Sequence, residues 1–257
     1  FQKMLWTNRI FCGMIKDSVY LRDRQMRNLG GIKSMRKVVK FGGSSLASAE
    51  QFKKVGDIIR ADKGRKYVVP SAPGKRFDGD IKVTDMLYAC YAKAEKKEDI
   101  TASIAAIRER YMEIINGLGL SLSLDDQFEV ISENFKKLAG SNYAASRGEY
   151  LNGIIMANYL GYEFIDAAEV IVFHEDGTFD AETTNEKLSA RLAECDNAVI
   201  PGFYGATAEG KVTTFSRGGS DITGSLIAKA VHADLYDRYY HLCRASRAGI
   251  HGCYRAS

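Results

Sequence analysis

Residues 215–221 read FSRGGSD and lead directly into an apolar helical run at 222–231. Two adjacent glycines let the backbone turn its N–H groups toward a bound anion, and the following helix aims the positive end of its dipole at the same place. Arg217 and Asp221 flank the glycines, so one side chain can contact the anion and the other a metal or ammonium group. A plain glycine turn with a capping serine has the same pattern, and this stretch alone does not separate the two.

Two further turns of this kind follow predicted strands nearer the N-terminus. Residues 36–41 are rich in branched side chains and predict a strand, GGSS at 42–45 ends it, and a helical period follows at 48–60. A second strand at 67–69 ends at PSAPG, residues 70–74. Strand, helix, strand in this order predicts a parallel sheet with helices on its faces.

The rest of the chain supplies covering helices and more strands. Amphipathic helices are predicted at 84–95, 100–116 and 124–138, a buried strand at 197–202 and a further strand at 211–215. Thr84 is the expected N-cap of the first of these helices. An apolar helix is predicted to start near Leu151, which would put Glu149 in its first turn, where the helix dipole favours a carboxylate.

Composition and charge exclude two classes of partner. No apolar run approaches the roughly 20 residues that span a bilayer, so we expect no membrane insertion. The formal charge of +4 is concentrated at the ends of the chain, because residues 35–237 carry 25 basic against 30 acidic side chains. A polyanion-binding surface is a basic patch on folded structure, so we expect no nucleic-acid binding.

Five cysteines without a framework spacing suit a reducing compartment. His241, Cys243, His251 and Cys253 could supply four zinc ligands, but their spacing matches no usual zinc module, and we assign no metal-ligating residues.

Both ends of the chain differ in character from its body. Residues 1–34 show no sustained period and no secretory signal, and we expect a non-native or disordered leader that precedes a start at Met35. Residues 237–257 show no period either, and we expect a tail without recognisable structure. The expected domain is therefore 35–236.

Five short motifs together resemble the aspartokinases of the amino acid kinase superfamily. They are VKFGGSS at 39–45, SAPGK at 71–75, KVTD at 82–85, SRGE at 146–149 and FSRGGSD at 215–221. Each is weak alone, but five in the right order across residues 36–236 are specific. Neither glycine turn is a Walker A loop or a Rossmann fingerprint.

The resemblance implies an α/β fold, a three-layer αβα sandwich with a mainly parallel central sheet that is incomplete at the C-terminus. It implies a cytoplasmic enzyme that uses ATP and Mg²⁺ to phosphorylate the side-chain carboxylate of L-aspartate. This is the first step of lysine, threonine and methionine biosynthesis. It also implies a homo-oligomer in the full-length form.

The resemblance also implies roles for individual residues. Lys40 and Asp221 match the catalytic positions, where the lysine neutralises the transferring phosphoryl group and the aspartate organises the lysine and the metal–phosphate assembly. The implied cradle for the nucleotide phosphates consists of Lys40, Gly42, Gly43, Ser44, Gly218, Gly219 and Ser220. The implied aspartate-binding residues are Ser71, Thr84, Glu149 and Arg217.

The chemistry of these residues supports the implied roles, but ordinary structural roles remain as alternatives. A carboxylate nucleophile is ionised at neutral pH, so the reaction needs no general base, and the four histidines lie outside every motif. Phosphoryl transfer instead needs positioning and charge neutralisation. The alternatives are a solvated strand-end lysine for Lys40, a helix-end carboxylate for Glu149 or Asp221, a turn serine for Ser71 and a helix cap for Thr84.

One departure from the family pattern limits the expected activity. Beyond Tyr236 the family continues with segments that hold the nucleotide and then with two ACT regulatory modules, and residues 237–257 match none of them. We therefore expect this polypeptide to bind ATP weakly and to have little or no kinase activity. The alternatives are another amino acid kinase, acting on glutamate, acetylglutamate or a nucleotide, and a non-catalytic interaction fragment.

Overall fold

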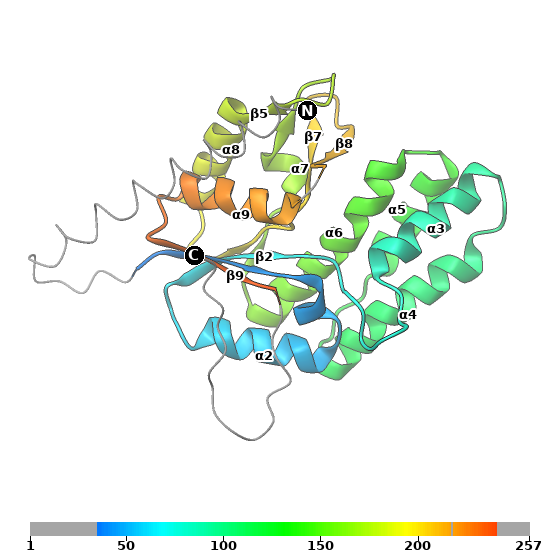
Figure 1. Ribbon diagram of the computed structural model, residues 1–257, viewed down its shortest axis with the longest axis horizontal. Coiled ribbons are helices and arrows are strands. Elements are labelled where there is room, and N and C mark those ends of the chain that lie inside the picture. The colour runs from blue at the N-terminus through cyan, green and yellow to red at the C-terminus, as the bar shows by residue number, and fades with distance from the viewer. Residues whose placement is uncertain (1–34, 217, 241–257) are drawn as a thin grey trace, which may run out of the picture.

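Two neighbouring sheets organise the computed structural model, which describes residues 35–216 and 218–240 (Figure 1). The larger sheet has the strand order β3 (Glu163–Phe164), β6 (Ala198–Val199), β2 (Arg65–Pro70), β1 (Lys37–Phe41) and β9 (Leu235–Tyr239). Every pairing in it is parallel. The predicted mainly parallel sheet is therefore confirmed.

Helices cover both faces of this sheet, as Figure 1 shows for α2 (Ala49–Arg60) and α9 (Gly219–Ala230). Successive residues of a strand point to opposite faces, and β1 follows this rule. Val39 and Phe41 belong to the core shared with α2 and α6 (Ser141–Leu160), whereas Val38 belongs to the core shared with α9 and α8 (Ala181–Ala193). The predicted three-layer αβα arrangement is confirmed.

Three helices extend the first of these cores beyond the edge of the sheet. They are α3 (Val83–Glu95), α4 (Thr101–Leu118) and α5 (Asp125–Lys136), and they pack on one another and on α6. Their bounds agree with the predicted helices to within a few residues. Each buries an apolar stripe, which is the pattern that predicted them, and apart from the buried Arg110 of α4 their charged side chains lie outside that stripe.

A second sheet delivers the glycine-rich stretch at 215–221. Its order is β5 (Phe179–Asp180), β4 (Val172–Phe173), β7 (Tyr204–Thr207) and β8 (Val212–Thr214), and it mixes parallel and antiparallel pairs. The short helix α7 (Ala167–Val170) precedes β4. Phe215, directly after β8, packs with ring centroids 5.0 Å from Phe173 and 5.3 Å from Phe179, which fixes where this stretch leaves the sheet.

Two helix starts differ from the prediction. The helix α6 begins at Ser141 instead of near Leu151, so Glu149 lies in its interior and the helix-dipole account of Glu149 is wrong. Arg147 and Glu149 are both buried. Because these polar residues lie on the inner face of α6, the apolar pattern that predicts a helix was absent from its first turns. The N-cap position of α3 is Lys82, without a side-chain capping bond, so Thr84 lies inside the first turn and does not cap this helix.

The boundary predicted at residue 237 is also wrong. β9 continues through Tyr239 and pairs residue by residue with β1, from Lys37 opposite Leu235 to Phe41 opposite Tyr239. The rings of Phe41 and Tyr239 stack at 4.9 Å. Because β9 is an edge strand among the described residues, it tolerates Asp237 and Arg238, which concealed it in the sequence.

Some expectations lie outside the described residues. These are the leader at 1–34, the remainder of the tail at 241–257 with its histidine and cysteine pairs, and Arg217. Within 35–216 and 218–240, no helix has the length and apolar character needed to cross a membrane.

Candidate active site

Lys40 and Asp221, the two predicted catalytic residues, form an ion pair. Lys40 lies near the end of β1 and is 6% exposed, and Asp221 lies in the first turn of α9. The Lys40 Nζ lies 3.2 Å from Asp221 Oδ1. The parallel sheet thus brings together residues that are far apart in the sequence, at the carboxyl end of a strand, where open α/β sheets bind ligands.

Tyr240 completes this pair, and the sequence did not indicate it. Its hydroxyl donates to Asp221 Oδ2 at 2.9 Å, and the Lys40 Nζ lies 4.6 Å from its ring centroid. The hydroxyl of Tyr236 donates to the main-chain oxygen of Asp221 at 3.1 Å. Residues of β9 and its end therefore hold the first turn of α9 against β1. Only the recognition of β9 as a strand would have revealed these contacts.

The first glycine turn packs main chain against main chain on the SAPGK loop. Gly74 donates its N–H to the Gly43 carbonyl oxygen at 2.8 Å, and a Cβ on Gly43 would lie 2.7 Å from the Ala72 carbonyl oxygen. Ser44 donates its hydroxyl to the Tyr240 carbonyl oxygen at 2.8 Å. Because a side chain would not fit into this contact, both positions, 43 and 74, require glycine.

The second glycine turn meets the end of β2. Gly218 has a φ of +63° at the N-cap position of α9, a left-handed conformation that favours glycine. A Cβ on Gly219 would lie 2.8 Å from the Phe203 ring. The Ser71 hydroxyl donates to Ser220 Oγ at 3.3 Å, so one predicted aspartate-binding residue adjoins the predicted phosphate cradle.

Glu149 is a buried carboxylate that faces the same loop. It is 7% exposed, and it accepts a hydrogen bond from the Ala72 N–H, while its Oε2 has no partner among the described residues. Burial raises the pKa of Glu149 to about 7, although Lys40 and Arg147 favour the charged form. Thr84 lies against the same turn of α6, because a Cβ on Gly148 would lie 3.7 Å from Thr84 Oγ1.

Arg147 and Asn152 support this region and were not predicted as site residues. The Arg147 guanidinium lies between the rings of Tyr143, Tyr150 and Tyr204 at 4.6, 4.5 and 5.2 Å. The Asn152 amide donates to the Ser71 carbonyl oxygen at 2.6 Å. Asn152 lies three residues after Glu149, so a helix assigned to 141–160 would have placed both on one face.

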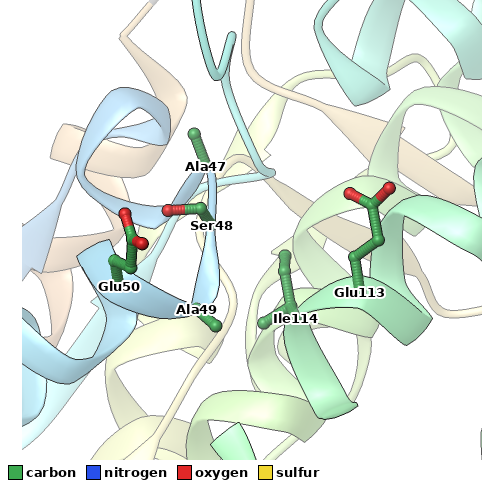
Figure 2. Close-up of a pocket in the computed structure, with 6 residues that line it drawn as sticks. All are labelled: Ala47, Ser48, Ala49, Glu50, Glu113 and Ile114. Atoms are coloured by element: carbon green, nitrogen blue, oxygen red, sulfur yellow. The ribbon is translucent and has the colours of Figure 1, made fainter. Parts of the chain in front are cut away.

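The hollow in Figure 2 is separate from this site. It has a volume of about 250 Å³, lies between α4 and the junction of η2 (Gly43–Leu46) with α2, and is lined in part by Glu50 and Glu113. None of the predicted site residues that the structure describes lines it.

The residues present fit a magnesium–phosphate assembly. No group of three or more histidine, cysteine or acidic residues that could hold a metal occurs within the described ranges. Mg²⁺ bound to a nucleotide, however, takes most of its ligands from phosphates and water, and one or two carboxylates suffice. Asp221 Oδ1 is buried, accepts no hydrogen bond from residues 35–216 or 218–240, and has Lys40 as its charged neighbour.

The chain belongs to the amino acid kinase family, because the model of that family matches residues 35–237. Within the family it is similar to aspartokinases. It is 39% identical over 219 residues to Aspartokinase 3 of Bacillus subtilis, covering 79% of this chain and 48% of the relative. The chain spans about half the length of the curated relatives it matches.

The chain is also similar to solved structures of aspartate kinases. The aspartate kinase of Clostridium acetobutylicum is 50% identical with a TM-score of 0.77, over 79% of this chain and 47% of that one. Aspartokinase III of Escherichia coli, in complex with aspartate and ADP, is 25% identical with a TM-score of 0.66, over 80% of this chain and 49% of that one.

Proposed function

We propose that this chain carries the catalytic site of an aspartate kinase, which transfers the γ-phosphoryl group of ATP to the side-chain carboxylate of L-aspartate. The Lys40–Asp221 pair, held where both glycine turns meet the ends of β1 and β2, carries the proposal. The named relatives support it, and one of their structures is described as a complex with aspartate and ADP.

The proposed reaction needs charge neutralisation and no base. An oxygen of the substrate carboxylate bonds to the γ-phosphorus, the bond to the β–γ bridging oxygen breaks, and its electron pair leaves with ADP. The Lys40 ammonium stabilises the negative charge of the transferring group, and burial strengthens its field. Mg²⁺, when bound, neutralises the phosphates, and the Asp221 carboxylate would hold it.

Recognition of aspartate requires one anion and several donors. In the proposal, Glu149 receives the substrate ammonium, since it is a buried carboxylate with one oxygen that has no partner in the described part of the chain. Ser71, Thr84 and Arg217 bind the substrate carboxylates. Gly43, Ser44, Gly218, Gly219 and Ser220 present N–H groups and a hydroxyl to the phosphates. The Gly42 N–H instead donates to the Tyr239 carbonyl oxygen at 2.8 Å, so in the proposal Gly42 contributes only the turn that leads into the cradle.

Titration calorimetry and an aspartyl-hydroxamate assay test the proposal. The chain is expected to bind L-aspartate in preference to L-glutamate and N-acetyl-L-glutamate. Its hydroxamate formation is expected to be slow, in keeping with the low activity expected from its sequence, and to require MgATP. A preference for another acceptor would identify another amino acid kinase. Binding of neither aspartate nor nucleotide would favour the non-catalytic alternative and contradict the proposal.

The setting of the activity is part of the same proposal. We assign the chain to amino-acid biosynthesis in the cytoplasm, supported by relatives that include a lysine-sensitive aspartokinase of Escherichia coli. A homo-oligomer in the full-length form is proposed from the family alone, and light scattering of the purified protein tests it.

Replacing Gly43 with alanine is expected to weaken MgADP binding on the order of tenfold. The new Cβ would lie 2.7 Å from the Ala72 carbonyl oxygen and 3.1 Å from the Gly74 nitrogen, so the two loops must separate. Gly42→Ala is the matched control, because its nearest neighbour is the Tyr240 carbonyl oxygen at 3.2 Å and a smaller effect is expected. Calorimetry with MgADP measures both, and equal losses would contradict the account of Gly43.

A further inference from the structure

Arg110 is a buried cation of α4 that belongs to none of the predicted motifs. It is 5% exposed, and it points at the loop between β2 and α3. Its Nη1 donates to both carboxylate oxygens of Asp80 at 3.0 and 3.2 Å and to the Ile81 carbonyl oxygen at 3.0 Å. Its Nη2 donates to the Gly74 carbonyl oxygen at 3.0 Å. One guanidinium therefore holds three points of this loop.

The loop held by Arg110 adjoins both proposed ligand sites. Ser71 begins it and Thr84 follows its end. In its middle, Gly74 is bound on both sides, because its carbonyl accepts from Arg110 and its N–H donates to the Gly43 carbonyl oxygen at 2.8 Å. A Cβ on Gly74 would lie 2.7 Å from the main-chain carbonyl carbon of Gly43, so the two loop segments are in direct contact and leave no room for a side chain.

Arg76 closes the loop on itself. Its main-chain N–H and its Nε both donate to Asp80 Oδ2, at 2.9 and 3.0 Å, and its Nη1 pairs with Glu113 of α4 at 2.7 Å. The hydrogen bonds from the Arg76 side chain hold the pKa of Asp80 well below its usual range, although burial of the carboxylate acts in the opposite direction. The carboxylate therefore stays charged throughout the working pH range.

The stability of the fold does not by itself explain the buried pair of Arg110 and Asp80. Taking two charges out of water costs about as much as their attraction returns, and apolar residues of similar size often stabilise a fold equally well. What apolar residues cannot do is donate to the carbonyl oxygens of Gly74 and Ile81. The specific contribution of Arg110 is therefore the fixed position of the loop.

We propose that Arg110 is a positioning residue, which acts through the loop at 71–82 to set the spacing between the Gly43 turn, Ser71 and Thr84. This inference rests on the proposed function of those three residues. Arg110 contacts neither ligand in this scheme. It fixes Gly74, and Gly74 fixes the phosphate-binding turn.

Arg110→Met, the double variant Asp80→Leu with Arg110→Met, and the control Arg108→Met test the proposal. Arg108 lies on the same helix, is half exposed and pairs with Asp125 at the surface. Arg110→Met is expected to lower the melting temperature and to weaken binding of L-aspartate and MgADP by tenfold to a hundredfold, on the order of the effect of a 1 Å displacement. Arg108→Met should change neither.

The double variant separates positioning from stability. It leaves no unpaired buried charge, so its melting temperature should return most of the way to that of the unsubstituted chain, while its ligand affinities stay low. Recovery of both would show a purely structural role and overturn the proposal.

Amide hydrogen exchange gives a readout that is independent of the proposed function. The Gly74 and Val83 amides, which donate to Gly43 and Pro73, should exchange faster in Arg110→Met. Unchanged exchange would overturn the positioning role. Failure of the unsubstituted chain to bind either ligand would instead contradict the proposed function, and exchange would still test the loop.

Discussion

Lys40→Met is expected to lower the rate of aspartate phosphorylation by about a thousandfold or more, the range found when a cation that stabilises a phosphoryl-transfer transition state is removed. Methionine keeps the length and apolar stem of the side chain and removes only its charge. The Lys40 Nζ lies 3.2 Å from Asp221 Oδ1 in a buried position, where water replaces the lost charge poorly. Affinity for L-aspartate should change much less than the rate.

The hydroxamate assay measures this effect, and Lys37→Met supplies the control. Lys37 lies on the same strand and pairs with Asp62 at 2.6 Å, at the end away from the site, so its loss should leave the rate within a few-fold. Lys40→Arg should fall between the two, because it retains the charge but not the compact ammonium. A Lys40→Met chain that keeps a tenth of the original rate would refute the catalytic assignment.

Glu149→Gln is expected to weaken L-aspartate binding by a hundredfold or more, since truncating one partner of a buried charge pair costs about 2–5 kcal/mol. Glutamine preserves the size of the side chain and loses the charge that the substrate ammonium needs. Binding to the unsubstituted chain should strengthen as the pH rises toward about 7 and then level off, because burial raises the pKa of Glu149 to about 7. The variant should show no such dependence.

Glu149→Gln is expected to stabilise the folded chain at high pH, although it weakens aspartate binding. A folded-state pKa raised from 4.5 to about 7 means that the folded chain holds a proton which the unfolded chain loses. This contribution is complete below about pH 4.5 and is lost as the pH rises through 7, so Glu149→Gln should be the more stable chain at pH 8. Melting curves at pH 5 and pH 8 measure it, with the surface variant Glu133→Gln as control. A pH-independent difference would contradict the buried charge.

The turns of the site could be predicted from sequence because their chemistry is local. Gly42–Gly43 and Gly218–Gly219 follow strands and precede helical turns, which places N–H groups at the strand ends in any parallel sheet. The family resemblance, which implies that Asp221 organises Lys40, placed these two side chains together, and the structure has them 3.2 Å apart.

Other parts of the site could not be predicted because they depend on contacts between distant residues. Glu149 was placed at a helix end, since nothing local shows that an arginine and a carboxylate face inward on α6. Asp80 is separated by 30 residues from Arg110, and the loop between β2 and α3 has the composition of an exposed polar segment. The contribution of Tyr240 depends on an edge strand whose sequence shows no alternation.

The alternation of β1 links catalysis to the accuracy of folding. A shift of its pairing by one residue would turn Lys40 into the apolar core beside α2 and place Phe41 or Val39 opposite Asp221. Such a shift would bury an unpaired ammonium and break the stack of Phe41 on Tyr239. The charge that the proposed reaction requires thus also disfavours misregistered states, so a chain that reaches a stable sheet has at the same time assembled the proposed catalytic pair.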